Sequence, residues 1–171
     1  MLRAFAVAVV LAAISRTCAA ASPPAPATQI RPQGETKISA SFGKVALEAN
    51  LLTHQVGIGS PSAPAIRRTS NCTYSHDPCM LVDSLEISVN GRQIAVPRSA
   101  FGDLSDLWTV AFHKTGSHRF TFVMIGGDAS EAYKATLTFD GKRVLQRSII
   151  DSEAGAVAER TVYFDLSHYF Q

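Results

Sequence analysis

The chain has 171 residues, which suits one domain of ordinary size rather than two. Apolar residues make up 46% of the sequence and charged residues 18%, so a hydrophobic core is available and wholesale disorder is excluded. The formal net charge is +2, but loss of Arg3 and Arg16 with the first 21 residues lowers Lys+Arg from 16 to 14, equal to the 14 Asp+Glu. A nucleic-acid binder needs a concentrated basic face, so this balance predicts no nucleic-acid partner.

The first 21 residues have the three parts of a secretory signal peptide. A basic start at Arg3 is followed by 11 apolar residues, Ala4 to Ile14, and then by small residues that suit cleavage just after one of Ala19–Ala21. The apolar run is too short to cross a bilayer, and no run of 18 apolar residues occurs in the chain. We therefore predict a periplasmic or secreted protein whose mature form has no transmembrane span.

Two cysteines, Cys72 and Cys79, remain after cleavage, an even number in an oxidising compartment. We predict that they form a disulfide, which contributes about 2–3 kcal/mol by closing a short loop. His76 and Asp77 lie between them and could make the group a metal site instead. No second Cys/His cluster completes a zinc pattern, so we predict a disulfide, no metal and no cofactor.

The mature chain is predicted to form a single β domain over residues 37–171, after a Pro-rich flexible leader over residues 22–36. Strands are predicted at Lys37–Phe42 and Val45–Leu52. The next segment, Thr53–Met80, is rich in Gly, Pro and small polar residues and has no sustained period. We expect it to be a long loop that the disulfide holds at its C-terminal end.

The strongest local signal is a hairpin over Leu85–Val96. Its Asn90-Gly91 pair favours a type I′ turn, because both central residues of that turn need positive φ. The turn predicts that Ile87 lies opposite Ile94 and Leu85 opposite Val96, with all four on one face.

A second hairpin is predicted from Trp108–Lys114 and His118–Ile125. A three-residue loop, Thr115–Ser117, is preferred, because a loop with an even number of residues would split the apolar residues between the two faces. The odd loop places six apolar residues on one face: Trp108, Val110, Phe112, Phe120, Phe122 and Met124.

A third hairpin is predicted from Tyr133–Phe139 and Lys142–Ile149 about Asp140-Gly141, again with a type I′ turn. It places Leu137 opposite Val144. The last predicted strand is Arg160–Leu166.

Seven to nine short strands with closely spaced turns predict an all-β fold of antiparallel hairpins, either a sandwich or a partly open barrel. One short helix is expected after the first Asn-Gly hairpin, within Arg98–Leu107, because Phe101 and Leu104 are three residues apart.

The sequence lacks the common catalytic and phosphate-binding motifs, among them G-x-S-x-G, the P-loop, H-E-x-x-H and G-x-G-x-x-G. His113 and His118 flank the second hairpin loop, but the odd loop sends them to opposite faces. The loop Gly126–Glu131 lacks the oxygen spacing of a calcium-binding EF-hand. These observations favour a protein that is not an enzyme.

Two stretches, VNGRQIAVPRSAFGDL and GGDASEAYKATLTFDGKRVLQR, resemble small exported proteins of Gram-negative bacteria to which no function is assigned. The resemblance covers roughly Leu85 to Phe164 and consists of strands and turns. It implies an envelope location and a β fold, and it transfers no active residue.

We therefore expect a non-catalytic protein-binding module, of the inhibitor or immunity type, whose partner is another envelope or secreted protein. Loops on rigid β scaffolds often carry recognition, and Arg and Tyr are the residue types that anchor interfaces. The candidate binding residues lie in the long loop: Arg67, Arg68, Tyr74 and His76. The alternatives are a small hydrolase with a spatially assembled site and a small-ligand carrier with an apolar cavity.

Overall fold

The computed structural model describes residues 25–57, 72–73 and 76–165. The predicted signal peptide, residues 1–21, lies outside these ranges. Within them the protein is mostly β, and no helix is long and apolar enough to cross a membrane.

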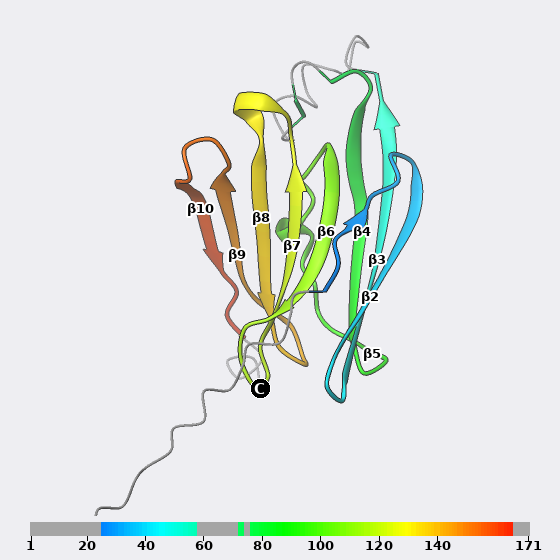
Figure 1. The fold of residues 1–171 in the computed structure, drawn as a ribbon, viewed down its shortest axis with the longest axis vertical. Helices are drawn as coiled ribbons and strands as arrows, with labels where there is room; N and C mark the ends of the chain where they lie inside the picture. Colours follow the sequence, from blue (N-terminus) through cyan, green and yellow to red (C-terminus); the bar gives the residue numbers. More distant parts are fainter. Residues whose placement is uncertain (1–24, 58–71, 74–75, 166–171) are drawn as a thin grey trace, which may run out of the picture.

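In the part of the chain that the structure describes, ten strands form two antiparallel sheets, which do not close into a barrel (Figure 1). The first sheet has six strands in the order β1-β6-β7-β8-β9-β10, and the second has four in the order β2-β3-β4-β5. The prediction of an all-β, antiparallel fold is confirmed. The strands are β1 Thr28–Gln29, β2 Gly34–Phe42, β3 Val45–Val56, β4 Cys79–Val89, β5 Arg92–Gln93, β6 Leu107–Lys114, β7 Phe120–Gly126, β8 Tyr133–Phe139, β9 Val144–Asp151 and β10 Val157–Val162.

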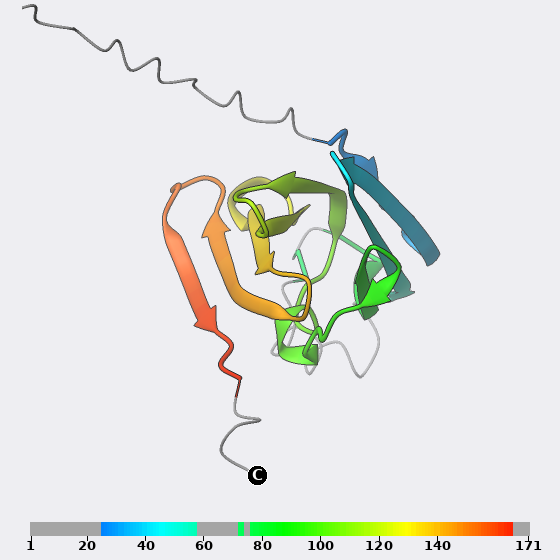
Figure 2. The ribbon, with the colours of Figure 1, turned by 90° about the horizontal axis from the view of Figure 1, so that it is seen from below.

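The main hydrophobic core lies between the two sheets, which face each other when the molecule is viewed end-on (Figure 2). Alternate residues of each strand point into it, as the two-residue period of a half-buried strand requires. Its centre is aromatic, because the rings of Phe112 and Phe122 lie 4.8 Å apart and Phe139 packs edge-on against Phe112. Phe42 of the four-stranded sheet reaches Phe120 of the six-stranded sheet, with 6.1 Å between ring centroids.

The Asn-Gly hairpin forms as predicted at its turn. Asn90 and Gly91 have φ of 51° and 75°, and the Ile94 amide donates to the Ile87 carbonyl over 2.9 Å. The predicted pairing of Leu85 with Val96 is wrong. The chain leaves this sheet after Ile94, because Ala95 instead forms backbone hydrogen bonds with Lys142 and Val144 at the end of the other sheet.

The second hairpin keeps the predicted faces for all but one of its apolar residues. Its loop is odd, as predicted, but it has five residues, 115–119, instead of three, so Phe112 pairs with Phe122 and Val110 with Met124. Trp108 is not in the core, contrary to prediction, and its side chain is 46% exposed. A β-bulge between Leu107 and Thr109 causes this, because the extra residue shifts the alternation and gives the inward position to Leu107.

The third hairpin has a different register from the predicted one. The Asp140 carboxylate accepts hydrogen bonds from the amides of Lys142 and Arg143, and this side-chain turn delays the start of β9 to Val144. A β-bulge between Thr138 and Phe139 then shifts the register by one further residue, so Leu137 pairs with Arg147 instead of Val144.

The new register buries Arg147, whose side chain is 5% exposed. Its guanidinium donates to the Ser99 carbonyl and to the Asp103 carboxylate, at 3.1 and 2.6 Å, and lies 3.3 Å from the Glu159 carboxylate. Through these contacts Arg147 of β9 holds two other parts of the chain in place: the segment after β5, which carries Ser99 and Asp103, and the edge strand β10, which carries Glu159.

Three other expectations differ from the structure. The short helix within Arg98–Leu107 is not confirmed, because that segment contains only a 3-10 turn at Arg98–Ala100. Part of the predicted leader belongs to the fold, since β1 pairs with β6 and Ile30 is buried in the core. The last strand is shifted towards the N-terminus, to Val157–Val162, and Phe164 beyond it is 77% exposed.

Candidate functional site

The disulfide-closed segment, Cys72 to Cys79, ends where β4 starts. As predicted, Cys72 and Cys79 lie at disulfide distance, with 5.7 Å between their Cα atoms. Cys79 pairs with Val56, so both ends of the predicted long loop are extended strand rather than loop. Of the predicted binding residues, only His76 lies in the described part of the chain. Arg67, Arg68 and Tyr74 lie outside it.

The buried carboxylate of Asp106 fastens this segment to the body. Its side chain is 1% exposed, and it accepts hydrogen bonds from the amides of Thr73 and Met80, each over 2.8 Å. The Asp106 amide in turn donates to the Met80 carbonyl over 2.8 Å. His76 is half-exposed, with its Nδ1 3.8 Å from the Asp106 carboxylate. Asp106 therefore holds both ends of the disulfide loop.

A buried tyrosine completes this anchor. The Tyr133 hydroxyl donates to the Ser105 carbonyl over 2.6 Å and accepts from the Ser105 amide over 3.0 Å. Burial raises the pKa of Tyr133 well above its ordinary value, and the nearby carboxylates of Asp106 and Asp103 add to this. The hydroxyl therefore stays protonated and acts as a structural donor. A side chain at Gly126 would place its Cβ 2.7 Å from this hydroxyl, so only glycine fits there.

The sulfur atoms of Cys72 and Cys79 and a carboxylate oxygen of Asp106 lie within 4.8 Å of one another. Three such atoms would suit a metal ion if the thiols were free. Because the two sulfurs are bonded to each other, they offer no thiolate ligands. The geometry fits an anchored disulfide, and the sequence could not reveal Asp106 because it lies 27 residues after Cys79.

We expect the Cys72→Ser/Cys79→Ser variant to fold, with a free energy of unfolding lower by about 2–3 kcal/mol, since the closed loop is short. Urea unfolding of the variant and of the oxidised wild type measures the difference. Thiol labelling of the unfolded, non-reduced wild type should detect no free thiol. Full labelling would contradict the bridge.

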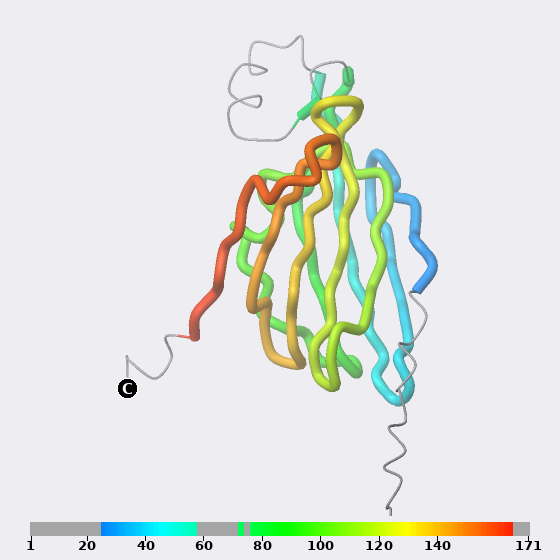
Figure 3. Tube along the Cα trace, turned by 60° about the vertical axis from the view of Figure 1, so that its left-hand side comes forward, coloured from blue at the N-terminus to red at the C-terminus, as the bar shows by residue number. Residues whose placement is uncertain are grey.

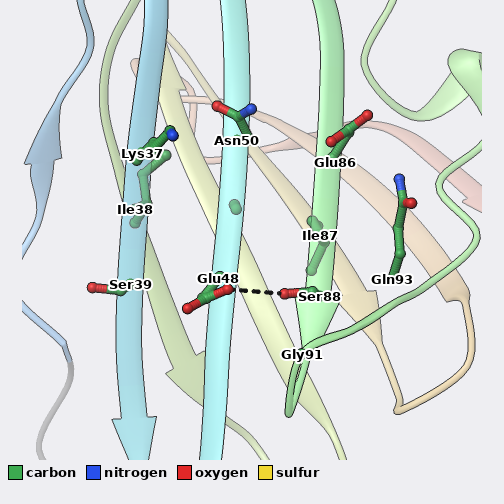
Figure 4. Close-up of a pocket in the computed structure, with 11 residues that line it drawn as sticks. Lys37, Ile38, Ser39, Glu48, Asn50, Glu86, Ile87, Ser88, Gly91 and Gln93 are labelled. Atoms are coloured by element: carbon green, nitrogen blue, oxygen red, sulfur yellow. Dashed lines mark hydrogen bonds between the residues drawn. The ribbon is translucent and has the colours of Figure 1, made fainter.

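An open polar groove of about 510 Å³ lies on the outer face of the four-stranded sheet (Figure 4). Its side chains come from β2, β3, β4 and β5, and the Ser88 hydroxyl lies 3.5 Å from the Glu48 carboxylate. Lys37 contacts Glu35 at 3.7 Å. The groove offers carboxylate, amide and hydroxyl groups to a polar ligand. Its polar side chains are Lys37, Ser39, Glu48, Asn50, Glu86, Ser88 and Gln93.

The outer face of the six-stranded sheet has a different character. Figure 3 shows β6 to β10 side by side on this face. One row of paired residues runs across all five strands: Thr109, Ile125, Lys134, Ile150 and Val157. Trp108 lies beside Thr109 at the bulge. We call Trp108, Ile125, Ile150 and Val157 the apolar row.

The apolar row is accessible to a partner. Trp108, Ile125 and Val157 are 46%, 41% and 51% exposed. Large apolar side chains scattered singly over a surface need no explanation, but here several gather on one face around Lys134, and an exposed apolar patch rimmed by polar residues marks an interaction site in many proteins. Sequence patterns did not reveal this row, because strict alternation places Trp108 in the core and Val157 falls in a predicted connection between strands.

Two further rows of paired residues complete the outer face of this sheet. None of the fifteen residues in the three rows is Asp or Glu, whereas Lys134 and Arg160 are cationic. Glu159 lies on the other side of β10, where it contacts Arg147. The second row is Ala111, Val123, Thr136, Ser148 and Arg160, and the third is His113, Thr121, Thr138, Gln146 and Val162.

Comparison with known proteins gives no relative from which a function could be transferred. No protein-family model matches the chain, and neither the search of curated proteins nor that of solved structures found a match. A function must therefore be inferred from the geometry of these surfaces.

Proposed function

We propose that the protein is an exported, non-catalytic binding module whose partner is another envelope or secreted protein. The observation that carries the proposal is the apolar row on the outer face of the six-stranded sheet. It combines an exposed Trp with branched aliphatic side chains, and Trp in particular is enriched among the residues that dominate binding energy. The signal-like N-terminus and the paired cysteines support export.

The scaffold suits this role. We take the two sheets to be a β-sandwich in which the six-stranded sheet presents a rigid face. Ladder hydrogen bonds fix the spacing of the row, and a rigid surface loses little conformational entropy when it binds. Recognition built on strands is also more precisely positioned than recognition built on loops.

The loop residues Arg67, Arg68 and Tyr74 remain a second predicted contact region within the same function. They are separable from the apolar row by mutation. Immobilised wild type, the Arg67→Ala/Arg68→Ala/Tyr74→Ala variant and the Ile125→Ser/Val157→Ser variant are each exposed to envelope extract, and captured proteins are compared. The proposal expects the serine variant to lose a band that the loop variant retains. The reverse pattern would assign binding to the loop.

A specific observation favours the hydrolase as the second candidate. Glu48 and Glu86 line the same groove from neighbouring strands, and paired carboxylates are the groups that glycoside hydrolysis uses. Glu48 pairs with Ser88 and Asn50 with Glu86, so the two carboxylates occupy diagonal positions. Hydrolysis of soluble polysaccharides by the wild type, lost in both Glu48→Gln and Glu86→Gln, would favour the enzyme. The binding proposal expects no such hydrolysis.

A further inference from the structure

The chemistry of the partner can be inferred from the charge of the outer face of the six-stranded sheet. Lys134 sits in the middle of the apolar row, between Ile125 and Ile150. Its aliphatic stem extends the apolar surface and its ammonium group remains at the surface. Arg160 is the second cation on this face, and no carboxylate accompanies either of them in the three rows.

A second copy of the chain is a poor occupant for this face. A symmetric dimer pairs one patch with the same patch of the other copy, and a two-fold axis through the middle of the row sets Lys134 against its own counterpart. The face carries no acidic side chain in its three rows that could offset this repulsion. Like charges brought together in this way disfavour association.

We infer that the partner presents a protein surface on which carboxylates lie among apolar side chains, placed to pair with Lys134 and Arg160. This inference rests on the proposed function. Lys134 and Arg160 lie two strands and two residues apart, so their Cα atoms are about 12 Å apart from standard strand spacings. The partner's carboxylates need a similar separation, with apolar groups over Ile125, Ile150 and Val157. Complementary charge of this kind gives specificity and speeds association.

Random twelve-residue peptides displayed on phage test this inference without the partner in hand. The library is selected on purified wild type, on Lys134→Glu/Arg160→Glu and on Ile125→Ser/Val157→Ser. We expect wild type to enrich peptides that combine Asp or Glu with apolar residues, and the charge-reversed variant to enrich Lys or Arg in their place. Peptides without a preferred charge, or basic peptides on wild type, would overturn the inference.

The three selections also separate this inference from the proposed function. If the serine variant loses the enrichment but charge reversal leaves the peptides unchanged, the binding face stands and the acidic partner is wrong. If the serine variant enriches the same peptides as wild type, the face itself is wrong. An acidic peptide should also bind wild type at least tenfold more tightly than the charge-reversed variant, measured by the fluorescence of Trp108, the single tryptophan.

Two other possible partners of this face, a lipid surface and a second copy of the chain, are tested directly. Sedimentation with vesicles of phosphatidylglycerol tests a lipid surface, and sedimentation velocity of the purified protein tests self-association. We expect wild type to stay in the supernatant and to sediment as a monomer. Vesicle binding lost in Lys134→Glu/Arg160→Glu, or self-association lost in Ile125→Ser/Val157→Ser, would overturn the inference of an acidic protein partner.

Discussion

Replacement of Asp106 by asparagine should lower the free energy of unfolding by about 3 kcal/mol, since a buried carboxylate that accepts two amide hydrogen bonds is lost. Asparagine preserves the shape and tolerates the φ of 48° found at this position, so the loss reports the hydrogen bonds rather than backbone strain. In asparagine an NH2 group replaces one of the two carboxylate oxygens, so a hydrogen-bond donor then faces the N–H of Thr73 or Met80. Urea unfolding at constant pH measures the effect.

The matched control for Asp106→Asn is Glu86→Gln, which neutralises an exposed carboxylate on the outer face of the four-stranded sheet. Its free energy of unfolding should change by no more than about 0.5 kcal/mol. Equal effects of the two substitutions would show that Asp106 does not fasten the disulfide loop. Thiol reactivity after mild reduction adds a local readout, because Cys72 and Cys79 should react faster in Asp106→Asn than in wild type.

The second large effect concerns binding. Ile125→Ser/Val157→Ser should weaken partner binding by roughly 100-fold, since central apolar residues of an interface often contribute 1–2 kcal/mol each. Both side chains are at least 41% exposed, so the melting temperature should change little. Titration calorimetry with the partner recovered by capture, and thermal unfolding of the free variant, measure the two quantities.

Leu52→Ser provides the matched control for this loss. Leu52 is a comparably exposed apolar residue, at 42%, but it lies on the outer face of the four-stranded sheet. The substitution should leave affinity unchanged. A similar loss in Leu52→Ser and in the double variant would point to general surface hydrophobicity rather than to the apolar row.

Local turn chemistry explains why part of the fold could be predicted from the sequence. The Asn90-Gly91 turn follows from the positive φ that its two residues adopt, and the odd loop after Lys114 follows from the alternation of the two strands. The Asp140 turn could not be predicted in the same way, because Asp-Gly supports a type I′ turn and also the side-chain turn that forms. That choice, together with the β-bulge between Thr138 and Phe139, moves the register of β9 and buries Arg147.

The proposed binding surface could not be predicted for a similar reason. A β-bulge leaves no mark in a strictly alternating pattern, so alternation places Trp108 in the core, and its exposure is due to the shift between Leu107 and Thr109. The Asp106 anchor depends on contacts between residues 26 and 33 positions apart in the chain, which no local pattern encodes. The predicted disulfide partners are close in sequence and needed only the compartment argument.

Site-specific photo-crosslinking tests the central claim most directly, namely that the outer face of the six-stranded sheet contacts a protein partner. Benzoylphenylalanine is placed at Ile125 in one variant and at Glu86 in another, and both are illuminated in intact cells that export the protein. We expect a protein adduct from position 125 and none from position 86. Adducts from position 86 alone, or no adduct from position 125, would contradict the claim.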